Sequence, residues 1–196
     1  MPPTSLSITL SEKFNIMRII AGKHRGRVLK EFDGYDIRPT SDRAREALFN
    51  IFATKIPDCS FLDLFAGTGA VGIEAISHGA KTVVMVDKRR ESIDIIKTNL
   101  ATVKENAMVI NTDAIDYLEA LKVKFDFIFV DPPYCSDLGF KALEIIARRG
   151  LLKKDGVVVF ESDKECPEVD NLDKISVRRY GKNVFNVFVG GNYEDD

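Results

Sequence analysis

Cysteine and histidine are scarce in this chain of 196 residues, and they are scattered. The three cysteines, Cys59, Cys135 and Cys166, are odd in number and far apart, which argues against a disulfide framework or a Cys-x-x-Cys metal site. His24 and His78 also lie far apart, and no group of His, Cys and carboxylate residues has the spacing of zinc ligands. We therefore expect reduced thiols and no metal site.

Long apolar runs and a large excess of one charge are also missing. No run approaches the roughly 18 apolar residues that span a bilayer. Residues 1–16 contain Glu12 and lack the charged start and apolar block of an export signal. These absences point away from membrane and secreted proteins, so a cytoplasmic location is expected. The formal net charge of −2 does not indicate a nucleic-acid-binding protein, because such domains are often strongly basic.

Apolar and charged residues make up 45% and 30% of the chain, which is enough for a buried core in one domain with a modest appendage. Strand and helix patterns alternate with short connections, which is typical of a parallel sheet covered on both faces. Expected strands cover residues 61–65, 82–87, 107–111, 125–130 and 157–161, and expected helices cover residues 42–55, 70–78, 89–100, 114–121 and 138–149. Residues 174–180 and 183–189 predict a final hairpin with an antiparallel strand. The pattern predicts an α/β, Rossmann-like fold with a mostly parallel seven-stranded sheet.

The N-terminal part of the chain is its basic end. Residues 17–36 read as a β-hairpin with Lys23, Arg25 and Arg27 at its turn. These cations either form an ordinary solvated surface or contact phosphates of a nucleic acid. We therefore divide the chain into a loosely ordered extension (residues 1–16), the basic hairpin (residues 17–36) and the main α/β domain (residues 37–196).

The glycine-rich turn after the first expected strand indicates a nucleotide-like ligand. Gly67, Gly69 and Gly72 match G-x-G-x-x-G, and Asp87 follows Gly67 by about 20 residues, as in dinucleotide-binding proteins. Asp63 argues against a dinucleotide, because a carboxylate beside this turn repels a pyrophosphate. The ammonium and sulfonium of S-adenosylmethionine (SAM) would instead be attracted by it. An acid at position 87 can accept both ribose hydroxyls.

Each of these acids also has a plain structural interpretation. Asp63 could be an exposed acid at a strand end, and Asp87 could cap a helix. Asp113 follows the third expected strand, where it could accept a hydrogen bond from the adenine amino group or simply cap the helix that begins at Ala114. The spacing alone leaves these alternatives open.

The run Val130-Asp131-Pro132-Pro133-Tyr134 ends the fourth expected strand. Prolines can simply terminate a strand. The functional interpretation is a site for an exocyclic base amine, whose lone pair is delocalised into the ring. The Asp131 carboxylate and the Pro132 carbonyl can each accept one N–H, the prolines add no competing donor, and Tyr134 offers a ring for an extruded base to stack on.

Four segments together resemble the RsmD family of bacterial SAM-dependent guanine-N2 methyltransferases that act on 16S ribosomal RNA. They are MRIIAGKHRGRVL, IRPTSDRAREALFNIF, DLFAGTGAVGIEAISHGA and VDPPY, and the likeness covers roughly residues 17–161. The glycine turn and VDPPY indicate only amine methylation, whereas the first two segments are narrower signals. Residues 162–196, including the acidic end, match no pattern of the family.

The resemblance implies ribosomal RNA as the partner, free or within the small subunit or an assembly intermediate, and SAM as the cofactor. It implies that the target amine meets Asp131, Pro132, Pro133 and Tyr134, and that the RNA meets Lys23, Arg25 and Arg27. The implied SAM contacts are Asp63, Phe65, Gly67, Gly69, Asp87, Asp113, Ala114, Arg38 and Thr40. Two other functions stay open, namely amine methylation of another nucleic acid, such as DNA adenine or cytosine, and a nucleotide-binding oxidoreductase module.

Overall fold

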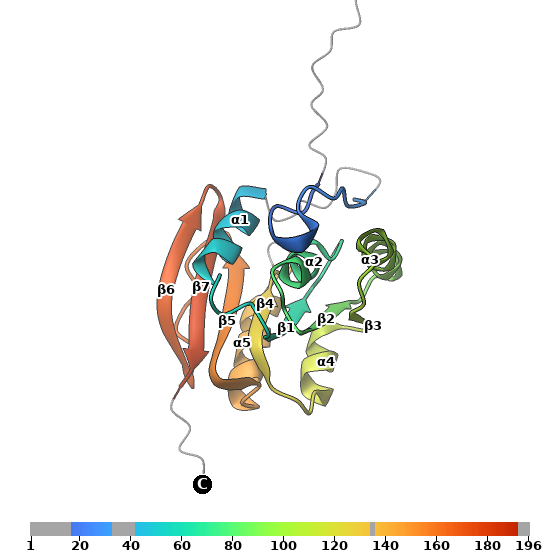
Figure 1. Cartoon of the computed structure of the whole chain (residues 1–196). Helices are drawn as coiled ribbons and strands as arrows, with labels where there is room; N and C mark the ends of the chain where they lie inside the picture. The colour runs from blue at the N-terminus through green and yellow to red at the C-terminus, as the bar shows by residue number, and fades with distance from the viewer. Residues whose placement is uncertain (1–16, 33–41, 134–135, 192–196) are drawn as a thin grey trace, which may run out of the picture.

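The computed structural model describes residues 17–32, 42–133 and 136–191. A seven-stranded sheet forms the centre of the molecule (Figure 1). The strand order is β3-β2-β1-β4-β5-β7-β6. The strands are β1 (Ser60–Leu64), β2 (Thr82–Asp87), β3 (Met108–Asn111), β4 (Phe125–Val130), β5 (Leu152–Ser162), β6 (Leu172–Tyr180) and β7 (Asn183–Gly190). Strands β1 to β5 pair in parallel, as the alternating sequence pattern predicts.

Helices cover both faces of the sheet because the central strands are apolar on both sides. One buried cluster joins the sheet to α1 (Asp42–Ile51), α2 (Ala70–Ser77) and α3 (Arg90–Val103). A second cluster joins the other face to α4 (Ala114–Ala120) and α5 (Leu138–Arg148). No helix within the described ranges is long and apolar enough to cross a membrane.

The last two strands form the predicted hairpin. Strand β7 pairs antiparallel with both β5 and β6, so it lies between them and β6 becomes an edge of the sheet. Because Val184 lies opposite Ser162 at the end of β5, the turn of this hairpin stands at the edge where the parallel strands end. Figure 1 shows this turn beside α1.

Two predicted boundaries differ from the structure by four residues or more. The helix expected to reach residue 55 ends at Ile51, and turns closed by bonds such as Lys55 N–H to the Phe52 carbonyl (2.8 Å) continue the chain. Strand β5 begins at Leu152, earlier than expected, because it pairs with Phe125 across a register shift. The polar run after Leu152 masks this extension in the sequence.

The predicted N-terminal β-hairpin is not confirmed. Residues 17–32, here called the N-terminal segment, contain a single antiparallel bridge between Arg18 and Val28 and a short 3-10 helix, η1 (Gly22–His24). The backbone N–H groups of Ile20 and Ala21 donate to a side chain of α2 instead of to a facing strand. Contacts with α2 therefore replace part of the expected ladder.

Candidate active site

The ends of β1, β2 and β4 lie side by side. Strand β1 is flanked by β2 and β4 in parallel, with Leu64 opposite both Val86 and Val130. The loops that follow are joined to their neighbours, since Ala66 N–H donates to the Val86 carbonyl at 2.9 Å and Asp131 N–H to the Leu64 carbonyl at 3.5 Å. The glycine turn and the Asp-Pro-Pro run therefore meet at one edge of the sheet.

The glycine turn has an unusual backbone. Phe65, Gly67 and Gly69 have positive φ angles of 69°, 55° and 77°. A Cβ at Gly69 would also lie 3.0 Å from a side-chain carbon of Ile96, so both the angle and the close packing favour glycine there. A Cβ built on Gly67 meets nothing within 4 Å, which leaves open space over the turn. The turn can thus accept a ligand against its backbone.

Asp63 is buried at the base of the turn. Only 2% of the residue is exposed, so its interpretation as an exposed strand-end acid is wrong. Its carboxylate accepts a hydrogen bond from Gly72 N–H at 2.8 Å. Burial raises the pKa of Asp63 to about 7, the Gly72 bond opposes that rise, and charge repulsion from Asp131 and Asp87 adds to it. The negative charges of Asp131 and Asp87 therefore act on Asp63, and a cation bound beside Asp63 would relieve this repulsion.

Asp87 ties the second strand end to the glycine turn. One carboxylate oxygen accepts from Gly67 N–H at 2.9 Å and the other from Arg89 N–H at 2.8 Å, just ahead of α3. The hydrogen bond from Arg89 N–H agrees with the interpretation of Asp87 as a helix cap. A carboxylate offers about four acceptor sites, so these two bonds leave capacity for ligand hydroxyls.

Asp113 and Ala114 follow β3, next to the end of β2. Asp113 caps α4, because one carboxylate oxygen accepts from Ile115 N–H at 2.9 Å. The capping alternative is thus realised, and the hydrogen bond to adenine stays a prediction. Ala114 is 4% exposed and packs in the second cluster.

The Asp-Pro-Pro run is held by α5. A Cβ added to Gly139 would lie 2.8 Å from a ring carbon of Pro132 and 2.3 Å from the ring of Phe160, so only glycine fits between them. Ser136 Oγ donates to the Pro133 carbonyl at 2.7 Å. Gly139 is missed by the sequence analysis, although a glycine in the first turn of a helix just after such a run is a usable signal. Tyr134, Arg38 and Thr40 lie outside the described residues, as do residues 1–16.

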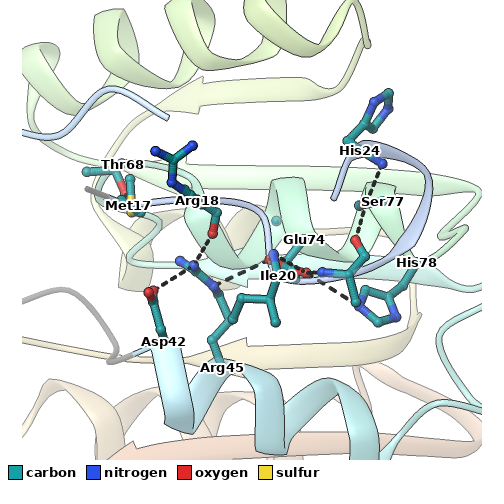
Figure 2. Close-up of polar contacts among 12 residues, drawn as sticks. Met17, Arg18, Ile20, His24, Asp42, Arg45, Thr68, Glu74, Ser77 and His78 are labelled. Carbon is teal, nitrogen blue, oxygen red and sulfur yellow. Dashed lines mark hydrogen bonds and ion pairs between the residues drawn. The ribbon is translucent and has the colours of Figure 1, made fainter. Parts of the chain in front are cut away.

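A buried ion pair between α1 and α2 fixes the N-terminal segment to the rest of the molecule (Figure 2). Glu74 on α2 accepts from Ile20 N–H at 3.0 Å and Ala21 N–H at 2.9 Å, and it lies 3.4 Å from Arg45 Nε. Arg45 Nη2 donates to the Arg18 carbonyl at 2.5 Å. Both side chains of the pair are 1% exposed, and burial lowers the pKa of Arg45 while Glu74 opposes that change.

The sequence analysis missed this pair. Its signal was Glu74, the one charged residue in the apolar helix AVGIEAIS.

On the outer side of the N-terminal segment, Lys23, Arg25 and Arg27 are exposed, as a phosphate-contacting surface requires. Lys23 forms an ion pair with Glu105 at 2.8 Å.

The chemistry of this edge is that of carboxylates and backbone groups. In the described ranges no group of three or more His, Cys, Asp or Glu residues could hold a metal ion. Cys59 and Cys166 are buried free thiols, and burial raises their pKa values to about 12 and about 11.

Comparison with known proteins agrees with the geometry. The family model described as "Conserved hypothetical protein 95" matches residues 17–189. The "Ribosomal RNA small subunit methyltransferase D" of Haemophilus influenzae is 36% identical over 156 residues, covering 77% of this chain and 81% of that protein. The protein of the same name from Escherichia coli K12 is 38% identical over 150 residues, covering 76% of each.

Solved structures share the fold. The Escherichia coli protein yhhF has a TM-score of 0.81 and 35% identity, covering 89% of this chain and 98% of that one. The protein SMU.776 in complex with SAH has a TM-score of 0.63 at 14% identity, and at that identity it supports the fold alone. From the family model and the relatives together, the chain belongs to the RsmD family.

Proposed function

We propose that this chain transfers a methyl group from SAM to the exocyclic N2 amine of a guanine in 16S ribosomal RNA. The observation that carries the proposal is the meeting of the glycine turn and the Asp-Pro-Pro run at the adjacent ends of β1 and β4. The first supplies a place for a methyl donor, and the second a place for an amine.

The residues around the glycine turn fit SAM. Asp63 is buried, and its pKa is raised to about 7 by burial and by two neighbouring carboxylates, so a cationic ligand suits this space. Asp63 would hold the ammonium side of the cofactor, Asp87 the ribose, and Asp113 the adenine. When bound, SAM supplies an electrophilic methyl group carried on a sulfonium.

The Asp-Pro-Pro run would orient the amine. The Asp131 carboxylate accepts one N–H and the Pro132 carbonyl accepts the other, which turns the nitrogen lone pair out of conjugation and toward the donor. The negative charge of Asp131 contributes to the raised pKa of Asp63, so the Asp-Pro-Pro run and the base of the glycine turn interact electrostatically. Catalysis then consists of positioning and charge stabilisation, without a covalent enzyme intermediate.

The target base must leave its stack to reach this edge of the sheet. Tyr134 would stack on the extruded guanine, and Arg25 and Arg27 on the exposed N-terminal segment would contact phosphates. Support for small-subunit RNA comes from the names of the relatives, which are small-subunit RNA methyltransferases.

The deciding experiment is methyl transfer from radiolabelled SAM to 16S ribosomal RNA, tested both as free RNA and in small-subunit particles that lack the modification. Mass spectrometry of the digested nucleosides should identify N2-methylguanosine in at least one of the two substrates. Methylation of a different atom or base overturns the guanine-N2 assignment. If the protein binds SAM but transfers no methyl group to either substrate, the ribosomal RNA assignment is wrong.

A further inference from the structure

A second group of cations stands at the active-site edge, far in sequence from the N-terminal segment. Arg178 and Arg179 lie just before Tyr180, the last residue of strand β6, and Lys182 follows in the turn; all three cations are exposed. We call residues 178–183 the β6–β7 tip. Within the described ranges, none of its three cations has a carboxylate within ion-pair distance; the Arg178 Nε–H group donates to Ser176 Oγ at 3.3 Å.

The strand register places this tip level with the catalytic run. Arg178 pairs with Phe185 on β7, and Phe185 pairs with Glu161 on β5. Glu161 is one residue beyond Phe160, the partner of Val130, so Arg178 and Asp131 share a row across the sheet. Three strand spacings separate them, which is about 14 Å along the edge.

The tip is also held in place. Asn183, the first residue of β7, donates its side-chain N–H to the Glu161 carboxylate, and both residues are buried. Figure 1 shows the tip beside α1, at the same end of the molecule as the N-terminal segment. Its cations are therefore displayed from a fixed strand end next to the site.

Protection of an open sheet edge is the alternative explanation, because edge strands often carry lysine and arginine. That explanation does not account for where the free charge lies on β6. Lys174, at the other end of the strand, is paired with Glu168 at 2.9 Å and Glu165 at 3.7 Å. The unneutralised cations of β6 are gathered at the active-site end.

We propose that the β6–β7 tip binds the RNA phosphodiester backbone next to the target nucleotide, on the side of Asp131 opposite the N-terminal segment. The inference rests on the proposed function, and it adds a second phosphate-contacting surface to it. The chain as a whole carries a formal charge of −2, so attraction to RNA must come from such local clusters. Contacts on both sides of the Asp-Pro-Pro run would hold the RNA strand while one base is extruded.

The test is a charge-reversal pair, Arg178→Glu with Arg179→Glu, compared with Lys122→Glu and Lys154→Glu. The control lysines are also exposed but lie near the starts of β4 and β5, at the opposite edge of the sheet. Binding to 16S ribosomal RNA is measured from 50 to 200 mM salt. The tip variant should bind more weakly, and its slope of log affinity against log salt should fall by about 1.4 to 1.8, for two lost phosphate contacts. The control and the SAM affinity of both variants should match the wild type.

The possible failures are distinguishable. If wild-type protein methylates the RNA but the tip variant keeps the wild-type salt slope, this inference is wrong and the proposed function stands. Weaker binding with an unchanged slope, or weaker binding only to particles, indicates a protein contact and also overturns it. If the wild type methylates no ribosomal RNA, the proposed function itself fails. Should the reversal unfold the protein, Arg178→Gln with Arg179→Gln provides the same comparison.

Discussion

The buried carboxyl of Asp63 makes SAM binding depend on pH. Its pKa is raised to about 7, chiefly by burial, in the protein without a ligand. If the cofactor's ammonium binds the ionised form, affinity must follow the ionised fraction. That fraction is about 3% at pH 5.5 and about one half at pH 7.0, so affinity should rise about 15-fold over this range. The range stays below the pKa of an α-amino group, about 7.7 to 8.0, so the ligand keeps most of its own positive charge throughout.

Isothermal titration calorimetry with SAM gives the affinity at each pH. Repeating it in buffers of different ionisation enthalpy counts protons, and close to one proton should be released per SAM bound at pH 5.5. Asp63→Asn keeps an acceptor for Gly72 N–H and removes the titration, so its weaker affinity should not change with pH. A wild-type affinity that stays within about twofold across the range refutes the assignment of Asp63 to the cofactor's cation.

The same raised pKa has a consequence for folding. The unfolded carboxyl titrates near 3.8 and the folded one near 7, so the folded state holds this proton more tightly. Protonation of Asp63 therefore adds up to about 4 kcal/mol to the free energy of unfolding. This contribution is fully present below about pH 4 and is lost as pH rises through about 7. Urea unfolding of wild type and Asp63→Asn should therefore diverge between pH 4 and 8, with the wild type losing more stability. Parallel pH profiles for the two proteins contradict the raised pKa.

Three further variants probe other contacts. Glu74→Gln removes one of the two carboxylates paired with the buried Arg45 guanidinium and leaves only the half-exposed Asp42, so it should lower the free energy of unfolding by about 3 kcal/mol in urea, whereas the exposed Glu46→Gln should not; equal stability of both would contradict the role of the pair. Gly139→Ala forces a Cβ against the Asp-Pro-Pro run, so single-turnover methyl transfer should slow while SAM affinity is kept; unchanged transfer would mean that the run does not depend on this packing. Reversal of both Arg25 and Arg27 to Glu should reduce RNA affinity and its salt slope by about 1.4 to 1.8, and an unaltered slope would return these residues to ordinary solvated surface.

The sequence predicts the site best where local rules decide the structure. Alternating strand and helix patterns fix a parallel sheet, and in such a sheet all strand ends of one direction share an edge. The convergence of Asp63, Asp87 and Asp131 follows from that rule, and the bond from Gly67 N–H to Asp87 realises the expected spacing. The hairpin of residues 174–180 and 183–189 is also predicted, because its pattern is local.

Long-range contacts explain what the sequence does not predict. The N-terminal segment fails to form a regular hairpin because Ile20 and Ala21 bond to Glu74, more than fifty residues away in sequence. The burial of Asp63, and hence its pKa, depends on packing that no strand pattern encodes. Arg178 and Asp131 share a row across the sheet only because β7 pairs with both β5 and β6. These features come from tertiary structure alone.

The most direct test of the central claim compares Asp131→Ala with Asp137→Ala. Asp137 is a nearby exposed acid whose side chain makes no capping bond to α5, so it controls for loss of charge beside the run. Asp131→Ala should slow single-turnover methyl transfer to RNA on the order of a hundredfold, or about 3 kcal/mol, with SAM affinity unchanged or tighter, and Asp137→Ala should behave as wild type. Near-normal transfer by Asp131→Ala would show that the amine is not oriented by this carboxylate.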